Sequence, residues 1–465
     1  MSLTHALKWS LFSELAAKLI QPVVFIILAR LLTPEDFGVM TAALMVIAFT
    51  QIFWEAGMSK VLIQRQSNIE ESSNAAFWVN IGLGCIIAFA LYFSAEPIAR
   101  IFFHDERVIA VLQVMTINIF LGASSAVHTA LLQKNMAFKK LFWIRFVTVG
   151  LPGLVSIPLA WNGMGYWALV VGTLTGQAMQ VILLWQMSAW RPKWSVNIQT
   201  IKEMQAFGGW VIITGLTSWT WGWADTFIAG YYFSVHEVGL LRMGNQLSVT
   251  IFSLIFGFMI PVLYSKFSSV SNNLDLIREW LFKSFLFIPI ISLPIGLIVF
   301  TFAKQIELFL FGEKWNGLAY VISLIALKES VLWVFGLDLE AYRAIGKPKY
   351  ETFVSIMSAI INIAVLYFFS GGVFYRFVFG RAIVVAVLGF LLHFLVIIYV
   401  FRKLDKVFFK ILVYILLFAV TVLTINSIEV HSIPDIFLRT GLVALFTLTL
   451  IYFELKFLKS VLYPK

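Results

Sequence analysis

Apolar runs of about twenty residues recur along the whole chain, with short polar turns between them. A bilayer core about 30 Å thick is crossed by about 20 helical residues, and in lipid every backbone N–H and C=O has to be paired within its own segment. Of the 465 residues, 60% are apolar and 12% are charged, which leaves too few polar side chains to cover a water-soluble fold. The sequence therefore predicts an all-α integral membrane protein.

We count fourteen runs that are long enough to span the membrane. The first run contains Glu14 and Lys18, so it is too polar for a signal peptide and is predicted to be a retained span. Cys85 is the only cysteine, which excludes intrachain disulfides and cysteine-based metal sites. The predicted spans are 10–31, 37–62, 75–94, 108–132, 141–160, 165–187, 206–232, 238–264, 281–302, 316–341, 351–370, 376–400, 409–427 and 437–455.

Lys and Arg residues are distributed unevenly over the segments between the runs. Most of them fall in the segments that are cytoplasmic if the N-terminus is cytoplasmic, as the positive-inside rule requires. We therefore expect both termini in the cytoplasm. The net charge of +10 is then explained by topology and by anionic lipid, and no nucleic acid partner is expected.

The chain also repeats itself at a spacing of about 200 residues. The segment Thr33–Gly38 follows the first run, and Ser234–Gly239 follows the seventh run 201 residues later. The basic turns Gln133–Lys139 and Arg343–Lys349 match at a spacing of 210. Three residues between these segments also recur at a spacing of 208. Ala95, Ile98 and Phe103 correspond to Ala303, Ile306 and Phe311.

Two interpretations of this repeat stay open. Either a six-helix unit is used twice, or the similarity is that of any two apolar segments. The first interpretation predicts a six-helix lobe over residues 1–200, a second and parallel six-helix lobe over 201–402, and two additional helices over 403–465. Parallel repeats of this kind are typical of transporters, which bind substrate between the copies.

Polar residues within spans predict functional sites because they are costly in lipid. Two sets of four residues each have the spacing of one helical face. They are Glu14, Lys18, Gln21 and Phe25 in the first run, and Thr214, Ser218, Trp221 and Asp225 in the seventh. We interpret both sets as facing a central cavity. The alternative is that Glu14 and Lys18 form an i, i+4 pair and that Asp225 bonds to a neighbouring helix.

Further cations lie near or within the spans. Arg30, Arg242 and Lys328 are candidates for binding an anionic head group, because guanidinium groups pair well with phosphate oxygens. The alternatives are snorkelling to the interface for the arginines and a structural ion pair between Lys328 and the adjacent Glu329. Trp221 is a candidate for stacking on a sugar, although most Trp residues are expected to be packing or interface residues.

Other motifs favour structural roles. The GxxxG motif at Gly172–Gly176 predicts tight packing within the bundle. His128 and His393 are isolated within their spans and are interpreted as packed residues. The sequence has no P-loop, GxSxG, HExxH or dinucleotide motif, and Asp338–Glu340 resembles an acidic metal-binding motif only superficially. We therefore expect a protein that is not an enzyme.

The segment Ala29–Val39, followed by Trp54–Met58 and Leu62–Arg65, resembles the polysaccharide exporters of the MOP superfamily. Within that superfamily it is similar to the Wzx-type flippases, which include the colanic-acid exporters. Ala130–Lys134 and Ala224–Gly230 resemble further parts of the same pattern. The resemblance extends through about residue 400.

This resemblance implies two six-helix lobes around a cationic cavity and transport by alternating access. The implied substrate is an undecaprenyl-pyrophosphate-linked oligosaccharide, which moves from the cytoplasmic to the periplasmic leaflet of the bacterial inner membrane for the synthesis of O-antigen, capsule or exopolysaccharide. The expected partners are this lipid, membrane lipids, and the polymerase and export machinery. No cofactor is expected, and coupling to H⁺, to Na⁺ or to neither stays open.

On this hypothesis the anionic head group contacts Lys18 and Arg30. The other residues predicted to bind substrate in the cavity are Gln21, Trp221, Arg242 and Lys328, and the residues predicted to couple transport to an ion are Asp225, Glu55 and Glu14. Two other functions stay open: a drug or small-solute antiporter of the same superfamily, and a membrane enzyme of glycan assembly. The two additional helices and the exporter-like start of the sequence favour the lipid-linked substrate over the antiporter.

Overall fold

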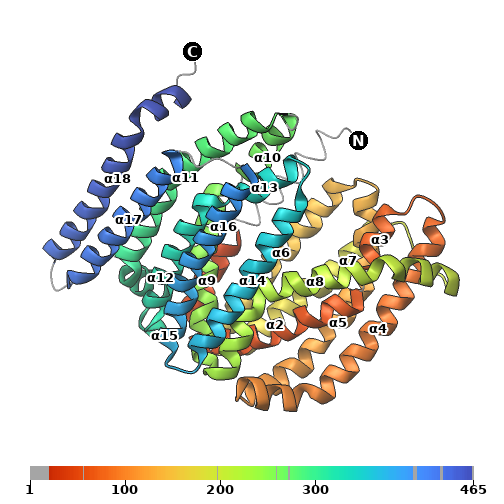
Figure 1. Ribbon diagram of the computed structural model, residues 1–465. Helices are drawn as coiled ribbons and strands as arrows, with labels where there is room; N and C mark the ends of the chain where they lie inside the picture. The colour runs from red at the N-terminus through yellow and green to blue at the C-terminus, as the bar shows by residue number, and fades with distance from the viewer. Residues whose placement is uncertain are drawn as a thin grey trace. The chain divides into compact units, whose positions relative to one another are not determined.

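The computed structural model describes residues 20–55, 57–195, 197–257, 259–270, 273–401, 406–429 and 433–462. Every regular element within these ranges is a helix, so the predicted all-α class is confirmed (Figure 1). In the described residues, twelve helices are long and apolar enough to cross a membrane. The chain is therefore a multi-pass membrane protein.

Two of the fourteen predicted spans are absent from these twelve helices. Residues 10–19 of the first predicted span lie outside the described residues, and its described part is the short apolar helix Ile20–Leu31. The seventh is α8 (Ile198–Tyr232), whose 35 residues are long enough to span but include polar side chains along its middle. The count of fourteen stays a prediction.

The chain divides into two compact units, Met1–Arg242 and Met243–Lys465. In the first unit α4 packs along α5 and α6 packs along α7, while α2 contacts both α5 and α8 (Figure 1). The described helices of this unit are Ile20–Leu31, α2 (Pro34–Glu55), α3 (Met58–Gln64), α4 (Ile69–Ile98), η1 (Ala99–Phe103), α5 (Arg107–Lys134), α6 (Phe138–Trp161), α7 (Tyr166–Met187), α8, and the start of α9 (Val235–Phe256).

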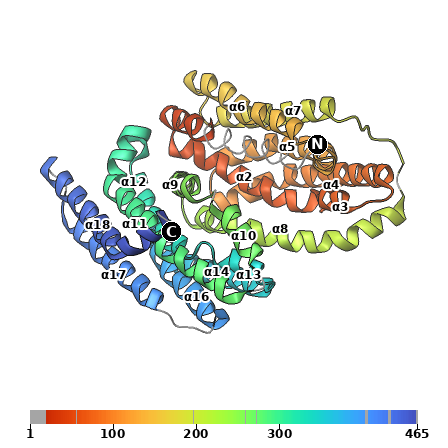
Figure 2. The same cartoon turned by 90° about the horizontal axis from the view of Figure 1, so that it is seen from above.

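In the second unit α11 packs against α12, and α17 and α18 lie side by side against α11 (Figure 2). The helices of this unit, after the end of α9, are α10 (Met259–Ser269), α11 (Leu274–Ile306), η2 (Glu307–Phe311), η3 (Glu313–Trp315), α12 (Leu318–Leu332), η4 (Trp333–Phe335), α13 (Asp338–Ala344), α14 (Pro348–Ser370), α15 (Phe374–Phe379), η5 (Gly380–Val384), α16 (Val385–Phe401), α17 (Lys406–Ser427) and α18 (Ile433–Leu462).

Small residues bring α6 and α7 into close contact. A Cβ atom at Gly172 would overlap the Ser156 hydroxyl oxygen, and a Cβ at Gly176 would lie 2.6 Å from Pro152 Cγ. The Ser156 hydroxyl also donates a hydrogen bond of 2.8 Å to the Ala168 carbonyl oxygen. The prediction that the GxxxG motif packs within the bundle is confirmed.

Three predicted spans are wrong as uninterrupted helices. The second, 37–62, is broken between α2 and α3, where Gly57 adopts the left-handed φ of 70°. The eighth, 238–264, is broken at Gly257 between α9 and α10. The tenth, 316–341, consists of α12, the 3₁₀ turn η4 and α13. In each case the apolar run continues through the break, so hydropathy alone does not register it.

The start of α2 and the start of α9 have the same cap. The backbone N–H and the hydroxyl of Thr33 both donate to Asp36 Oδ2, at 3.0 and 3.1 Å. The backbone N–H and the hydroxyl of Ser234 both donate to Glu237 Oε2, at 2.9 and 3.0 Å. Segments that match in sequence therefore fold in the same way at this point.

The other matching segments also share their local structure. The π-helical turns η1 and η2 begin and end 208 residues apart, in the same places as the sequence match. After α5 the Ala137 N–H donates to the Leu132 carbonyl, and 210 residues later, after α13, the Lys347 N–H donates to the Tyr342 carbonyl. These agreements favour a duplicated unit over chance similarity of apolar sequence.

The first turns of α2 and α9 cross at two glycines. A Cβ atom at Gly38 would overlap the Val235 carbonyl oxygen, and a Cβ atom at Gly239 would overlap the Pro34 carbonyl oxygen. The two contacts are equivalent, because each of these residues of α9 lies 201 positions after its counterpart in α2. The crossing thus has local two-fold symmetry.

Candidate functional site

A pocket of about 300 Å³ opens between α2, α3 and α8 in the first unit. Its apolar lining includes Ile52 and Val211. Gly215 lets α8 approach α2 closely at this pocket, because a Cβ atom at Gly215 would lie 2.9 Å from Ile52 Cγ2. The polar and aromatic residues that line it are Gln51, Glu55, Lys60, Ser218, Trp219 and Trp223.

Helical spacing explains why these side chains converge. Gln51 and Glu55 lie one turn apart on α2, and the Gln51 amide donates to Glu55 Oε2 at 3.4 Å. Trp219 and Trp223 lie one turn apart on α8 and face α2. The Trp219 indole N–H donates to the Met45 carbonyl oxygen at 3.2 Å, which fixes this ring across the two helices.

A cation extends the polar surface of this pocket. The Arg242 guanidinium carbon lies 4.2 Å from the centre of the Trp223 ring, within the range of a cation–π interaction. Glu55 lines the pocket beside the same indole, and Lys60 adds an exposed ammonium group at the start of α3. Glu55 and Arg242 were both predicted as site residues. Glu55 lines the pocket, and Arg242 contacts Trp223, a lining residue that the sequence-based prediction did not include.

This arrangement suits a ligand that has both polar and apolar faces. Flat indole rings accept the C–H face of a sugar ring, and the amide, hydroxyl and carboxylate groups beside them accept or donate hydrogen bonds to its hydroxyls. Ammonium and guanidinium groups bind phosphate oxygens. The pocket therefore has the chemistry to hold a sugar next to a phosphate.

The structure places the other predicted residues of the first unit elsewhere. Glu14 and Lys18 lie outside the described residues. Gln21 and Arg30 are exposed side chains of the helix Ile20–Leu31 and do not line the pocket. Trp221 is also outside the pocket lining and is 58% exposed.

Asp225 is buried, and its Oδ1 accepts hydrogen bonds from the backbone N–H and the hydroxyl of Thr226 at 2.7 and 3.3 Å. It does not line the pocket. In the second unit, Lys328 Nζ lies 3.0 Å from Glu329 Oε1, so the ion pair weighed as an alternative is present. The roles of both residues in binding or coupling stay predictions.

The predicted stripe on α8 overlaps this pocket only at Ser218. The lining tryptophans are Trp219 and Trp223, and Trp221 is not among the lining residues. The role of the stripe stays a prediction. The signal that could have found the lining tryptophans is the crowding of tryptophans in this helix. Gln51, one turn before Glu55, was also missed.

The interpretation of His393 as an isolated packed residue is wrong. His393 Nδ1 lies 2.7 Å from Asp338 Oδ2, so the two side chains form a buried acid–base pair in the second unit. His128 is packed as predicted, with its ring centroid 4.7 Å from that of Trp185 and 5.2 Å from that of Trp190.

Charged groups also gather where α2 and α9 cross. Glu35 Oε1 lies 2.6 Å from His236 Nδ1. Nearby, Asp105 accepts hydrogen bonds from the side chain and backbone N–H of Arg107. Partial burial raises the pKa of Asp105, but these hydrogen bonds and the charge of Arg107 outweigh it, so the pKa lies below its ordinary value.

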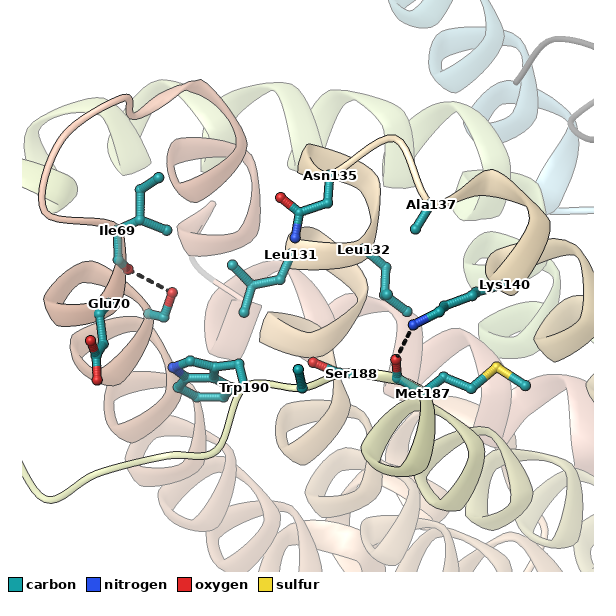
Figure 3. Close-up of a pocket in the computed structure, with 12 residues that line it drawn as sticks. Ile69, Glu70, Leu131, Leu132, Asn135, Ala137, Lys140, Met187, Ser188 and Trp190 are labelled. Atoms are coloured by element: carbon teal, nitrogen blue, oxygen red, sulfur yellow. Dashed lines mark hydrogen bonds between the residues drawn. The ribbon is translucent and has the colours of Figure 1, made fainter. Parts of the chain in front are cut away.

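A larger pocket of about 480 Å³ lies at the ends of α4, α5, α6 and α7 (Figure 3). Leu131, Leu132 and Trp190 form apolar walls, and the Lys140 ammonium at its edge donates 2.8 Å to the Met187 carbonyl oxygen. None of the predicted site residues lines this pocket.

Comparisons with known proteins place this geometry in a family. The family described as "Polysaccharide biosynthesis protein" matches residues 27–320. The chain is 22% identical over 359 residues to the succinoglycan biosynthesis transport protein ExoT of Rhizobium meliloti, covering 77% of this chain and 72% of that protein. It is 21% identical over 384 residues to the lipopolysaccharide biosynthesis protein WzxC of Escherichia coli, covering 81% and 74%.

Solved structures show the same fold. The lipid II flippase MurJ in an inward closed conformation matches with a TM-score of 0.75 at 14% identity, covering 97% of this chain and 100% of that one. An inward-facing multidrug resistance MATE transporter of the MOP superfamily matches with a TM-score of 0.64 at 15% identity, covering 85% and 96%. Since the family match covers well over half of the sequence, the chain belongs to the polysaccharide biosynthesis protein family, and its resemblance to the polysaccharide exporters of the MOP superfamily is confirmed.

Proposed function

We propose that the protein is a flippase that moves an oligosaccharide linked to undecaprenyl pyrophosphate from the cytoplasmic to the periplasmic leaflet of the bacterial inner membrane. The observation that carries the proposal is family membership combined with a fold shared with the lipid II flippase MurJ. The names of ExoT and WzxC, which refer to succinoglycan transport and lipopolysaccharide biosynthesis, support a glycan substrate for a surface polysaccharide.

The proposed architecture is two parallel six-helix lobes, 1–200 and 201–402, with two additional helices over 403–465 and both termini in the cytoplasm. The matching caps, π-helical turns and helix ends support two copies of one unit. In this topology the crossing of α2 and α9 lies at the periplasmic side. Transport by alternating access then requires these two helix starts to separate.

The pocket between α2 and α8 is the proposed contact for the glycan head group. Trp219 and Trp223 provide ring faces for a sugar, and Gln51 and Glu55 provide hydrogen bonds. The pyrophosphate is proposed to bind Lys60 of the pocket and Arg242 beside Trp223. The other proposed pyrophosphate contacts are the cations predicted from the sequence: Lys18, Arg30 and Lys328. Gln21 and Trp221 are proposed to contact the rest of the head group.

Leaflet exposure of a labelled undecaprenyl-pyrophosphate oligosaccharide in proteoliposomes tests this function. We expect wild-type protein to expose the label in the opposite leaflet, and empty vesicles to leave it in place. Lys18→Ala is expected to reduce the rate at least tenfold, because it removes a charge that binds the head group. An unaffected rate in a folded, inserted Lys18→Ala protein would move the head-group site to the cations around the pocket.

The remaining predictions on coupling are tested by the same assay. Asp225, Glu55 and Glu14 are each exchanged for the neutral isostere, and the rate is measured with and without an imposed H⁺ or Na⁺ gradient. A residue whose variant keeps both the rate and the gradient dependence has no part in coupling. If wild-type protein moves no glycan lipid but expels cationic dyes, the antiporter function replaces the proposal.

A further inference from the structure

The second unit contains a buried acid–base pair that the proposed function has not used. Asp338 is 0% exposed, and its Oδ2 lies 2.7 Å from His393 Nδ1. Its other carboxylate oxygen, Oδ1, is buried and has no hydrogen-bond partner among the described residues. A buried carboxylate in a membrane span is costly, so a pair of this kind marks a functional group more often than a packing element.

The backbone around Asp338 is that of an interrupted span. Asp338 is the first residue of α13. It follows the 3₁₀ turn η4 and the two residues Gly336 and Leu337, which together separate α13 from α12. Irregular backbone at membrane depth is tolerated where it lines a site or a cavity, and broken helices recur at ion sites of transporters. Phe335, from the same turn, stacks on the His393 ring with centroids 6.3 Å apart and an interplanar angle of 10°.

The pair is not sealed from its surroundings. The side chain of His393 is 17% exposed, while that of Asp338 is fully buried. Since Nδ1 faces the carboxylate, Nε2 is the ring atom left to exchange a proton. His393 is thus the member of the pair that can bind a proton without breaking its contact with Asp338.

Other charged groups on the packed elements are occupied by one another. The hydroxyl of Tyr342 lies 3.4 Å from Asp338 Oδ2 and is the further titratable group in contact with the pair. Most other charged and phenolic groups on α10 to α14 and on η5 form separate contacts: Arg343 with Glu340 and Glu351, Lys328 with Glu329, Lys283 with Glu279, Arg278 with Asp275, Lys304 with Glu307, Arg381 with Asn245, Tyr320 with the Tyr375 carbonyl, Lys266 with the Trp280 ring, Lys349 with the Tyr350 ring, and Tyr350 with the Tyr342 and Tyr399 rings.

The first unit provides an internal comparison. The residue 210 positions before Asp338 is His128, which lies on the uninterrupted helix α5. His128 is 0% exposed and packs against Trp185 and Trp190, with neither ring nitrogen hydrogen-bonded within the described part of the chain. The fold therefore accommodates this position without an acid, so packing alone does not require the pair in the second unit.

We propose that Asp338 and His393 form a proton-binding site that couples transport to the proton gradient. A proton from solvent binds His393 Nε2, and the resulting imidazolium donates from Nδ1 to the Asp338 carboxylate. The pair is then neutral overall, whereas without the proton it carries one negative charge. Moving a neutral pair through a low-dielectric interior costs less than moving a charged one, so conformational change favours the protonated pair. What the proton drives rests on the proposed function, whereas proton binding itself does not.

Proton binding is tested on purified full-length protein in lipid nanodiscs, without substrate. Potentiometric titration with infrared detection between ~pH 5 and ~pH 9 covers the range in which histidine changes charge. We expect His393→Gln to bind one proton fewer than the wild type, and Asp338→Asn to shift the imidazole signal of His393 to lower pH. His128→Gln, the matched control, should titrate as the wild type does. Equal proton uptake by wild type and His393→Gln would overturn the proposal.

Coupling is tested in proteoliposomes with labelled glycan lipid and an imposed pH gradient. We expect the gradient to accelerate flipping about tenfold in the wild type and in His128→Gln. Asp338→Asn and His393→Gln should lose this acceleration and keep the rate seen without a gradient. Acceleration that persists in both variants overturns coupling through this pair. If no protein moves glycan lipid, the proposed function fails, while the titration still decides whether the site binds a proton.

Discussion

Trp219, Trp221 and Trp223 lie within five residues on α8 but differ in what their rings contact. Trp219 and Trp223 line the pocket with Glu55, whereas Trp221 is 58% exposed and lies outside it. A helix turns about 100° per residue, so neighbouring positions face different surroundings. The surroundings of each tryptophan ring are thus decided by its position around the helix. The predicted stripe included Trp221, which lies two residues from each of the two tryptophans that line the pocket.

These tryptophans give the first prediction. Trp223→Ala removes a ring face of the pocket and the partner of Arg242, and base-stacking values for aromatic platforms imply a loss of about 1–3 kcal/mol in ligand binding. We expect flipping of the glycan lipid at limiting concentration to fall at least fivefold. Trp161→Ala, the control, removes a ring at the end of α6 that is 78% exposed and lies outside the pocket. It should change the rate by less than about twofold. Equal losses in the two variants would contradict the assignment of the pocket as the head-group site.

Asp105 gives a prediction of pH dependence. Arg107 holds the pKa of Asp105 in the folded protein below its ordinary value. The interaction therefore stabilises the fold at any pH above the ordinary carboxyl pKa, and this stabilisation is lost as pH falls through the lowered pKa. At neutral pH, Asp105→Asn should lower the free energy of unfolding by about 0.5–1 kcal/mol. Thermal unfolding of both proteins in detergent should show this difference persisting above the ordinary carboxyl pKa of about 4 and shrinking as pH falls below it. A difference independent of pH would contradict it.

At the scale of elements, hydropathy and helix length predict most spans but not their interruptions. The broken spans between α2 and α3, and between α12 and α13, contain apolar sequence on both sides, and only Gly57 and Gly336 mark the positions. The sequence also does not predict the pairing of Asp338 with His393. The two residues are 55 positions apart, and only the tertiary fold brings their side chains on α13 and α16 together. Periodicity reports the face of a single helix and not the partner that the face meets.

The crossing of α2 and α9 gives a prediction at this scale. Gly38→Ala places a methyl group on the Val235 carbonyl oxygen, so the helices must move apart, and overpacking of this kind costs about 1–3 kcal/mol. Gly82 on α4 has open space where its Cβ would lie, so Gly82→Ala should be neutral or slightly stabilising. Unfolding temperatures in detergent compare the two variants. A Gly38→Ala protein as stable as Gly82→Ala would contradict the close contact.

For the whole molecule, the repeat was predictable because its loops keep recognisable residues, and the caps and π-helical turns agree with the sequence match at 201 and 208 residues. The lobe boundaries at residues 200 and 402 stay predictions. The first compact unit extends to Arg242, because α8 packs against α2, α3 and α4. A duplicated chain need not separate into compact units at the point of duplication. Contacts between the copies, such as that of Glu35 with His236, bind the start of the second copy to the first.

This contact between corresponding residues gives the prediction for the molecule as a whole. Glu35 and His236 lie 2.6 Å apart at the crossing of α2 and α9. The proposed alternating access requires this crossing to open on the side proposed to be periplasmic. Replacing both by cysteine in a Cys85→Ser background and joining them with a short thiol cross-linker should stop flipping, because the helix starts can no longer separate. Cleaving the cross-link with reductant should restore the rate.

The control for this experiment joins two residues that are not expected to separate. Glu70 and Lys193 also form a pair at 2.6 Å, but both lie within one predicted lobe, on α4 and on the segment after α7. Cross-linking cysteines at these positions should leave the flipping rate within about twofold of the uncross-linked protein, since motion of one lobe as a rigid body keeps their distance fixed. Undiminished flipping with positions 35 and 236 joined would show that transport does not open this crossing, and the substrate would then have to leave between other helices.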